Sequence, residues 1–320
     1  MRRMREKKTI FFLLFAGAIF LGFIFYLNHS ETGGMDKSDG SFFFYQSFPS
    51  EFVVPRPVDV WLPEGYDSNP DVHYPVVYMH DGQLLFDKPS SPMAKFWYRP
   101  FDWYVGGMFW EVDKTMSRLI LEKQIRPAIV VSIWFIPNRR GAEFMPQKPI
   151  TMVETGLERI GDSDVTPDDV ISDNYLKFLT EELKPFVDKN FRTLTDRDNT
   201  FVMGSSMGGL ISAYAISEYS DVFGGAACLS TDWTHGKGAE IDWYKTHWPR
   251  AGSHRLYFDY GTESYDAPFE PFQKRMDNVM RQHGYVEEVD WVTKKFEGAN
   301  HSPKAWRERL HVPLIFLLGN

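Results

Sequence analysis

The sequence predicts an α/β fold of three layers, in which helices cover both faces of a mostly parallel sheet. Short apolar runs alternate along the chain with longer amphipathic segments, as expected where strands and helices alternate. The central apolar runs, such as 74–80 and 128–135, are continuous and rich in β-branched residues, which is typical of strands buried on both faces. With 43% hydrophobic residues among 320, the chain can supply the core of one large domain.

The expected elements follow one another between residues 42 and 320, which we interpret as a single domain. Strands are predicted at 58–63, 74–80, 128–135, 200–204, 225–230, 255–261 and 289–296. Helices are predicted at 110–124, 173–190, 207–219, 268–283 and 303–317. Residues 83–109 are rich in aromatic residues and proline without a clear period, and we expect them to form a loop above the sheet.

The N-terminus has the pattern of a membrane signal anchor. A basic segment at 1–9 precedes an uncharged apolar run at 10–27, close to the roughly 20 residues that cross a bilayer as a helix. The basic flank should stay in the cytoplasm, which places the domain outside it, in the periplasm or at the cell surface. Residues 28–41 are polar and predict a tether. A cleaved signal peptide, which would make the protein secreted, is the alternative.

Charge and cysteine content exclude some classes of protein. The chain has 35 Lys and Arg against 43 Asp and Glu, a net charge of −8, and its one basic cluster is the N-terminal segment. We therefore expect no nucleic-acid partner, because such proteins carry a clustered basic surface. Cys228 is the single cysteine and lies in an apolar stretch, so we interpret it as a core residue.

The strongest motif is FVMGSSMGGL at 201–210. A predicted strand ends there and a predicted helix begins, and Gly204 to Gly208 fits the pattern G-x-S-x-G around Ser206. At such a sharp turn small residues let strand and helix approach, and the serine hydroxyl is exposed above the sheet, as in the α/β-hydrolase fold. The pattern predicts that Ser206 is a nucleophile.

A serine hydroxyl needs a base, and the base needs an orienting acid. In this fold the chain order is serine, acid, histidine. His301 lies just beyond the last predicted strand and is the candidate base. The loop after the strand 255–261 offers two candidate acids, Glu263 and Asp266, and the sequence leaves both open.

An oxyanion hole is the remaining requirement. One donor should be the backbone N–H after the nucleophile, that of Met207. The second should come from the loop after the strand 74–80, where Gly82 and Gln83 are the candidates. A plain turn at Asp81 and Gly82 is the structural alternative.

With these residues placed, the sequence resembles the esterase D-type family of α/β-hydrolases. This family includes siderophore esterases, feruloyl and acetylxylan esterases, S-formylglutathione hydrolases and mycolyltransferases. The resemblance covers about residues 52–316, and its markers are LPEGYDSNPDVHYPVVYMHDGQLLFD, NRRGAEFMP, YLKFLTEELKPFVDKNFRT, MGSSMGGL, DYGTESYDA and GANHSPKAW. It implies a nucleophile at Ser206 and a base at His301. It also implies that Arg140 or Glu143 lies near the site and contacts substrate, with a structural ion pair as the alternative.

The implied reaction is hydrolysis of a carbohydrate, phenolic or siderophore ester, without metal or organic cofactor. Two other functions stay open on the same residues. An acyltransferase would pass the acyl group from Ser206 to a sugar, and a non-catalytic protein would keep only the fold.

Overall fold

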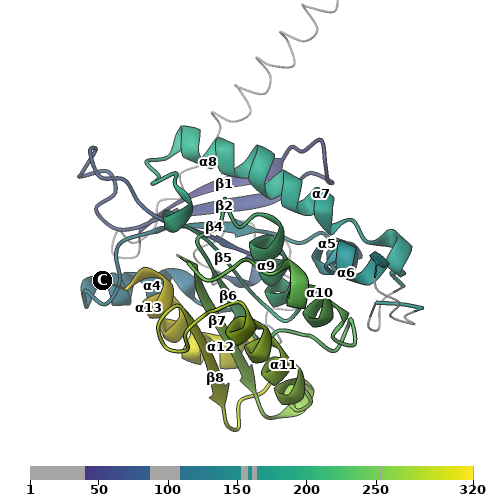
Figure 1. Cartoon of the computed structure of the whole chain (residues 1–320). Helices are drawn as coiled ribbons and strands as arrows, with labels where there is room; N and C mark the ends of the chain where they lie inside the picture. Colours follow the sequence, from purple (N-terminus) through teal and green to yellow (C-terminus); the bar gives the residue numbers. More distant parts are fainter. Residues whose placement is uncertain (1–39, 87–108, 153–157, 161–163, 253, 320) are drawn as a thin grey trace, which may run out of the picture.

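An eight-stranded sheet forms the centre of the molecule (Figure 1). The computed structural model describes residues 40–86, 109–152, 158–160, 164–252 and 254–319. The strand order across the sheet is β1-β2-β4-β3-β5-β6-β7-β8. The strands are β1 (Ser41–Phe48), β2 (Arg56–Leu62), β3 (Val76–Met79), β4 (Ile129–Ile133), β5 (Thr200–Ser205), β6 (Gly225–Leu229), β7 (Arg255–Gly261) and β8 (Trp291–Phe296).

The sheet is mixed. From β4 through β3 and β5 to β8 every neighbouring pair is parallel, while β2 runs antiparallel to both β1 and β4. The sequence did not predict β1, whose pairing with β2 shifts register between Tyr45 and Phe48. That irregularity breaks the alternation of buried and exposed side chains by which an edge strand is recognised.

Two hydrophobic clusters, one on each face of the sheet, make the fold three-layered. Along β3, Val76 and Tyr78 belong to one cluster, and Val77 and Met79 belong to the other, since side chains alternate along a strand. The first face is covered by α7 (Ser172–Lys177), α8 (Lys184–Asn190), α9 (Met207–Glu218), α10 (Ala239–His247) and α11 (Phe269–Gln282). The second is covered by α4 (Val112–Leu121), α12 (Pro303–Arg309) and α13 (His311–Leu318) (Figure 1).

The predicted helices correspond to α4, α9, α11 and two composite segments. The segment predicted at 173–190 is α7, a π-helical stretch at Phe178–Leu183 and α8 in direct succession. The segment predicted at 303–317 is divided into α12 and α13. Three helices were not predicted: α5 (Arg140–Phe144), α6 (Gln147–Met152) and α10. The first two are too short to show a helical period.

The predicted fold class needs one correction. In the part of the chain that the structure describes, no helix combines the length and the apolar character needed to cross a bilayer. The signal anchor predicted at 10–27 lies outside the described residues, as do 28–39 of the predicted tether and 87–108 of the predicted aromatic loop. The supported fold class is an α/β fold with a mixed sheet, and the membrane anchor is not carried forward.

The topology brings four chain segments to one edge of the sheet. Because β5, β6, β7 and β8 are parallel, the residues that follow them lie at the same edge. Ser206 follows β5, Ser230 follows β6, Asp266 lies shortly after β7, and His301 lies shortly after β8. In open α/β sheets this carboxyl edge is where ligands bind.

Candidate active site

Ser206 lies in the tight turn between β5 and α9, in a backbone conformation that is rare for a residue with a side chain. Its φ is 58° and its ψ is −123°. Its N–H donates to the Leu229 carbonyl at 2.9 Å, and its carbonyl accepts from the Asp232 N–H at 3.3 Å. Strained backbone of this kind persists only where the surroundings impose it, and it concentrates at functional sites.

Gly204 explains why the turn needs a glycine on the strand side. A Cβ on Gly204 would lie 2.7 Å from the carbonyl carbon and oxygen of Gly208, so strand and helix meet backbone to backbone. The two flanking positions of the G-x-S-x-G pattern are therefore in contact across the turn, as the sequence predicted.

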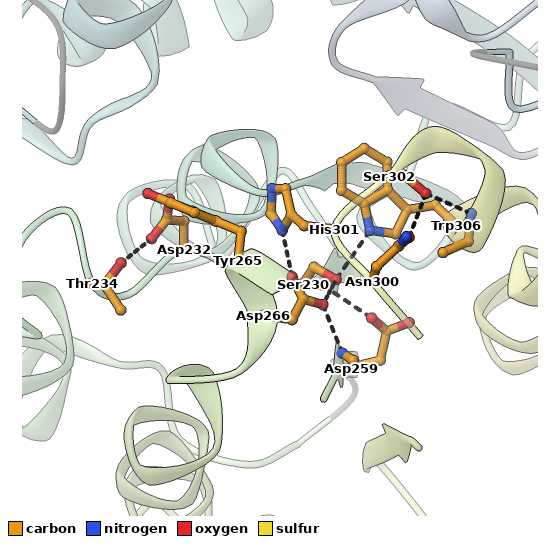
Figure 2. Close-up of polar contacts among 12 residues, drawn as sticks. Ser230, Asp232, Thr234, Asp259, Tyr265, Asp266, Asn300, His301, Ser302 and Trp306 are labelled. Carbon is orange, nitrogen blue, oxygen red and sulfur yellow. Dashed lines mark hydrogen bonds and ion pairs between the residues drawn. The ribbon is translucent and has the colours of Figure 1, made fainter. Parts of the chain in front are cut away.

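His301 and Asp266 are brought together by the loops after β8 and β7. The Asp266 Oδ1 and the His301 Nδ1 form a short hydrogen bond, which Figure 2 shows as a direct contact. The Asp266 side chain is fully buried, and that of His301 is 14% exposed. The rings of Tyr265, Phe269 and Trp306 meet the imidazole edge to face at centroid distances of 5.0, 5.8 and 5.0 Å. These contacts fix the ring plane of His301.

Asp266 stays ionised despite its burial. Burial alone raises the pKa of a carboxyl group, but hydrogen bonds from His301 and Ser230 lower it, and the pKa of Asp266 lies below its usual value. Its Oδ2 accepts from the Ser230 hydroxyl at 2.6 Å and from the Gly261 N–H at 2.7 Å. An ionised acid beside Nδ1 leaves the other imidazole nitrogen free to take a proton.

A buried polar network extends behind Asp266 and was not predicted. The Ser230 hydroxyl accepts from the Trp306 indole at 3.0 Å and from the Arg309 Nη2 at 2.7 Å. Arg309 in turn forms a buried ion pair with Asp259, whose oxygens lie 2.9 and 3.1 Å from its nitrogens. The signal in the sequence is weak, because these residues come from three segments and match no local motif.

Glu263, the other candidate acid, lies away from the histidine. It is exposed, and its backbone N–H donates to the Ala299 carbonyl at 3.0 Å. It precedes a single 3₁₀ turn at Ser264–Asp266, and that turn carries Asp266 inward while Glu263 faces solvent. Of the two candidate acids, Asp266 is the one that contacts His301.

The comparison with known families decides the class of protein. A family model described as Putative esterase matches residues 51–317, almost the whole described domain. The chain belongs to the Esterase family. The resemblance seen in the sequence is confirmed, and family membership makes the chain a carboxylic ester hydrolase.

Known relatives of this esterase are distant in sequence. The uncharacterized protein YbbA of Bacillus subtilis (strain 168) is 22% identical over 270 residues, which is 82% of this chain and 93% of YbbA. A ferulic acid esterase of Anaeromyces mucronatus has a TM-score of 0.57 at 20% identity, covering 87% of this chain and 88% of its own. The enterobactin esterase of Shigella flexneri, solved with enterobactin, has a TM-score of 0.58 at 18% identity, covering 91% of this chain and 60% of its own. The structural likeness shows a shared fold.

The candidate oxyanion donors of the esterase lie beside the turn that carries Ser206. Met207 is the first residue of α9, so its N–H has no acceptor within the helix. Gly82 and Gln83 lie in a 3₁₀ turn just after β3, and both are buried. A Cβ on Gly208 would lie 3.2 Å from the Asp81 carboxylate, so the start of this turn contacts the start of α9.

The loop that holds Gly82 and Gln83 is anchored to β4 and the residues after it. The Ser132 hydroxyl donates to the Gly82 carbonyl at 3.2 Å, and the Phe135 N–H donates to the Gln83 side-chain oxygen at 3.2 Å. These bonds hold the Gly82 carbonyl and the Gln83 side-chain oxygen, and the oxyanion donors expected at Gly82 or Gln83 stay a prediction.

Arg140 lies near the site in an ion pair. Its Nε and Nη2 bond the two oxygens of Asp81 at 2.7 and 2.8 Å, and its side chain is 26% exposed. A bidentate pair of this kind holds the αL residue Asp81, whose φ is 58°. The structural role foreseen as the alternative is present, and the exposed part of the guanidinium can still face a substrate.

Glu143 is corrected from a substrate contact to a core ion pair. Its side chain is fully buried, and both its oxygens bond Arg56, at 2.7 and 2.8 Å. A carboxylate that is fully buried and bonded on both oxygens has no atom left for a substrate. The sequence could not show this, because Arg56 lies 87 positions away on β2.

A second imidazole–carboxylate pair flanks the first. The Nδ1 of His235 lies 2.5 Å from the Oδ2 of Asp232. Burial raises the pKa of Asp232, but hydrogen bonds from His235, Thr234 and Tyr265 outweigh it, so the pKa lies below its usual value. Figure 2 shows Tyr265 between Asp232 and His301.

Among the described residues, no group of three or more His, Cys, Asp or Glu could hold a metal ion. The expectation of a cofactor-free reaction stays a prediction.

Proposed function

We propose that the esterase hydrolyses carboxylic esters through a triad of Ser206, His301 and Asp266 and an acyl-enzyme intermediate. The observation that carries the proposal is the hydrogen bond between His301 and the buried, ionised Asp266, on the sheet edge where the Ser206 turn lies. Serine, acid and base on the loops after β5, β7 and β8 match the order Ser, Asp, His.

The geometry gives each residue one role. With Nδ1–H donated to Asp266, the Nε2 of His301 accepts the Ser206 hydroxyl proton as the serine oxygen bonds the acyl carbon. The carbonyl oxygen becomes an oxyanion, for which the N–H groups of Met207 and of Gln83 or Gly82 are donors. His301 then gives its proton to the leaving alcohol oxygen. A water molecule, deprotonated by His301, attacks the acyl carbon, and the acid leaves as the Ser206 hydroxyl is restored.

The proposed substrates are carbohydrate, phenolic or siderophore esters. Structurally similar proteins include ferulic acid esterases and an enterobactin esterase, which supports this range without choosing within it. We also propose that the domain acts outside the cytoplasm, and this rests on the N-terminal sequence alone. Protease treatment of cells stripped of their outer layers, with the cytoplasmic membrane intact, tests it: degradation of the domain or its release into the medium supports it, and full protection of cell-bound domain contradicts it.

The activity is tested with p-nitrophenyl esters from acetate to octanoate and with the ferulate, using the purified chain. Ser206→Ala and His301→Ala should each lower kcat by at least about 10⁴-fold, with Glu263→Gln as a matched carboxylate control that retains activity. Adding a sugar acceptor and analysing products separates hydrolysis from acyl transfer. Turnover that survives in Ser206→Ala would refute the triad.

A further inference from the structure

The proton of the Ser230 hydroxyl has one possible destination. A serine hydroxyl has one hydrogen to donate and two lone pairs to accept with. Ser230 lies within hydrogen-bond distance of the Trp306 indole N–H at 3.0 Å and the Arg309 guanidinium at 2.7 Å, and both groups can only donate. Its third partner is the Asp266 Oδ2 at 2.6 Å. The hydroxyl must therefore donate to Asp266.

The group that orients Ser230 is itself fixed. The Arg309 side chain is 4% exposed and that of Asp259 is fully buried, and the pair is joined by two hydrogen bonds. Asp259 also accepts from the Ser230 backbone N–H at 3.0 Å and from the Tyr257 hydroxyl at 3.0 Å. Both the hydroxyl and the backbone of Ser230 are thus tied to one buried ion pair beneath the site.

We propose that Ser230 is a positioning residue for the esterase reaction, oriented by Arg309 and Trp306 so that its hydroxyl holds the Asp266 carboxylate ionised and turned toward His301. This inference rests on the proposed function of His301 and Asp266. The Gly261 N–H binds the same Asp266 oxygen, so Oδ2 is saturated and Oδ1 is left for the imidazole.

Loss of the Ser230 hydroxyl has a definite electrostatic consequence. Without this donor, the Asp266 carboxylate carries more unshared negative charge and stabilises the His301 imidazolium more strongly. The charged or titratable groups around the pair are Asp259, Arg309 and Tyr257 behind Asp266, Tyr265 against the imidazole, and Asp232 and His235 beyond Tyr265. All of them stay in place, so the pKa of His301 should rise.

The first experiment compares Ser230→Ala with the wild type over the pH range of the p-nitrophenyl acetate reaction. We expect kcat to fall about 10- to 100-fold with little change in KM, because the base is less well held. The acid limb of kcat/KM should move up by about half a pH unit. Ser172→Ala is the matched control, since Ser172 is equally buried and accepts the Gln147 N–H at 2.9 Å far from His301. A folded Ser230→Ala with an unchanged acid limb and unchanged kcat overturns the proposal.

A second pair of variants tests the role of Arg309 where a single truncation could unfold the chain. The double variant Arg309→Met with Asp259→Asn removes both buried charges together. It should reproduce the loss of kcat that we expect for Ser230→Ala. Arg309→Lys keeps one donor and the charge, and should restore part of that kcat. Equal, wild-type kcat in both variants contradicts the inference.

A readout without turnover separates this inference from the proposed activity. The His301 Nδ1 proton, bonded to Asp266, should give a downfield proton resonance whose titration reports the imidazole pKa. A higher pKa in Ser230→Ala supports positioning even if no ester is turned over, in which case the proposed function fails alone. An unchanged titration refutes positioning even in an active enzyme.

Discussion

Asp266 and Glu240 are both fully buried carboxyl groups, yet the structure gives them opposite charge states. Asp266 accepts hydrogen bonds from His301, Ser230 and the Gly261 N–H, and its pKa is lowered. Glu240, at the start of α10, has no partner among the described residues for either oxygen, and burial raises its pKa to about 8. Neither side chain is exposed to solvent, and the hydrogen-bond donors around Asp266 offset the cost of burying its charge.

The two carboxyl groups therefore differ in what they can contribute to the site. At neutral pH Glu240 is mostly protonated and carries no charge, while Asp266 is ionised and can stabilise an imidazolium. We therefore expect substitution of Glu240 to change how the free energy of unfolding depends on pH. Substitution of Asp266 should instead change the rate of ester hydrolysis.

The largest effect is expected for Asp266→Asn, which removes the charge and reverses one hydrogen bond to His301. We expect kcat to fall on the order of 10³- to 10⁴-fold, because the imidazole loses its correct tautomer and its counter-charge. The measurement is kcat for p-nitrophenyl acetate at pH 7.5 and at about one pH unit above and below it. Glu240→Gln serves as the buried control and should keep kcat within about twofold; an Asp266→Asn enzyme as active as this control would remove Asp266 from the triad.

Glu143 is another buried carboxyl group. It differs from Asp266 and Glu240 because its hydrogen-bond donor is the guanidinium of Arg56. Glu143→Gln leaves Arg56 buried without a counter-charge and should lower the free energy of unfolding by about 3–5 kcal/mol. Urea denaturation measures this loss. KM should not change, because a reduced folded fraction lowers only the apparent kcat; a raised KM with intact stability would return Glu143 to the substrate site.

Glu240→Gln should affect stability only at pH values where the unfolded wild type ionises this carboxyl group. The folded pKa of about 8 lies above the ordinary value of 4.5, so the wild type is destabilised progressively as pH rises from about 4.5 to 8. Relative to wild type, Glu240→Gln should gain nothing at pH 5 and on the order of 2–4 kcal/mol near pH 8.5. Denaturation at both pH values measures it, with the exposed Glu64→Gln as control. A gain that does not depend on pH would show that the fold leaves the pKa of Glu240 at its ordinary value.

Gly261→Ala disturbs the surroundings of Asp266 without changing its charge. The new Cβ would lie 2.2 Å from the Ala299 carbonyl oxygen and 2.9 Å from the Asp266 Oδ2, so the loop carrying His301 must move. We expect a loss of about 1–3 kcal/mol in unfolding free energy and a several-fold lower kcat. Gly252→Ala, whose Cβ would meet nothing within 4 Å, is the control and should match the wild type in both measurements.

The sequence predicted those parts of the fold and site that follow from local patterns. The turn around Ser206 combines an apolar strand, small residues and a helix within ten positions, so both its conformation and its place could be inferred. His301 followed from chain order, and the buried central strands followed from their continuous apolar runs. The edge strand β1, with its register shift, has no such pattern.

What the sequence could not predict depends on side chains that meet across long separations. Glu263 and Asp266 are equivalent by position, and only the 3₁₀ turn between them decides which faces His301. Ser230 and Arg309 are 79 positions apart, and Arg56 and Glu143 are 87 apart, so neither pairing leaves a trace in local sequence.

The most direct test of the central claim is covalent labelling of the purified chain with a fluorophosphonate, followed by peptide mass spectrometry. The account predicts one adduct, on Ser206, that forms much more slowly in Asp266→Asn and at the wild-type rate in Glu240→Gln. An adduct on Ser205, or no adduct on the folded wild-type protein, would contradict it.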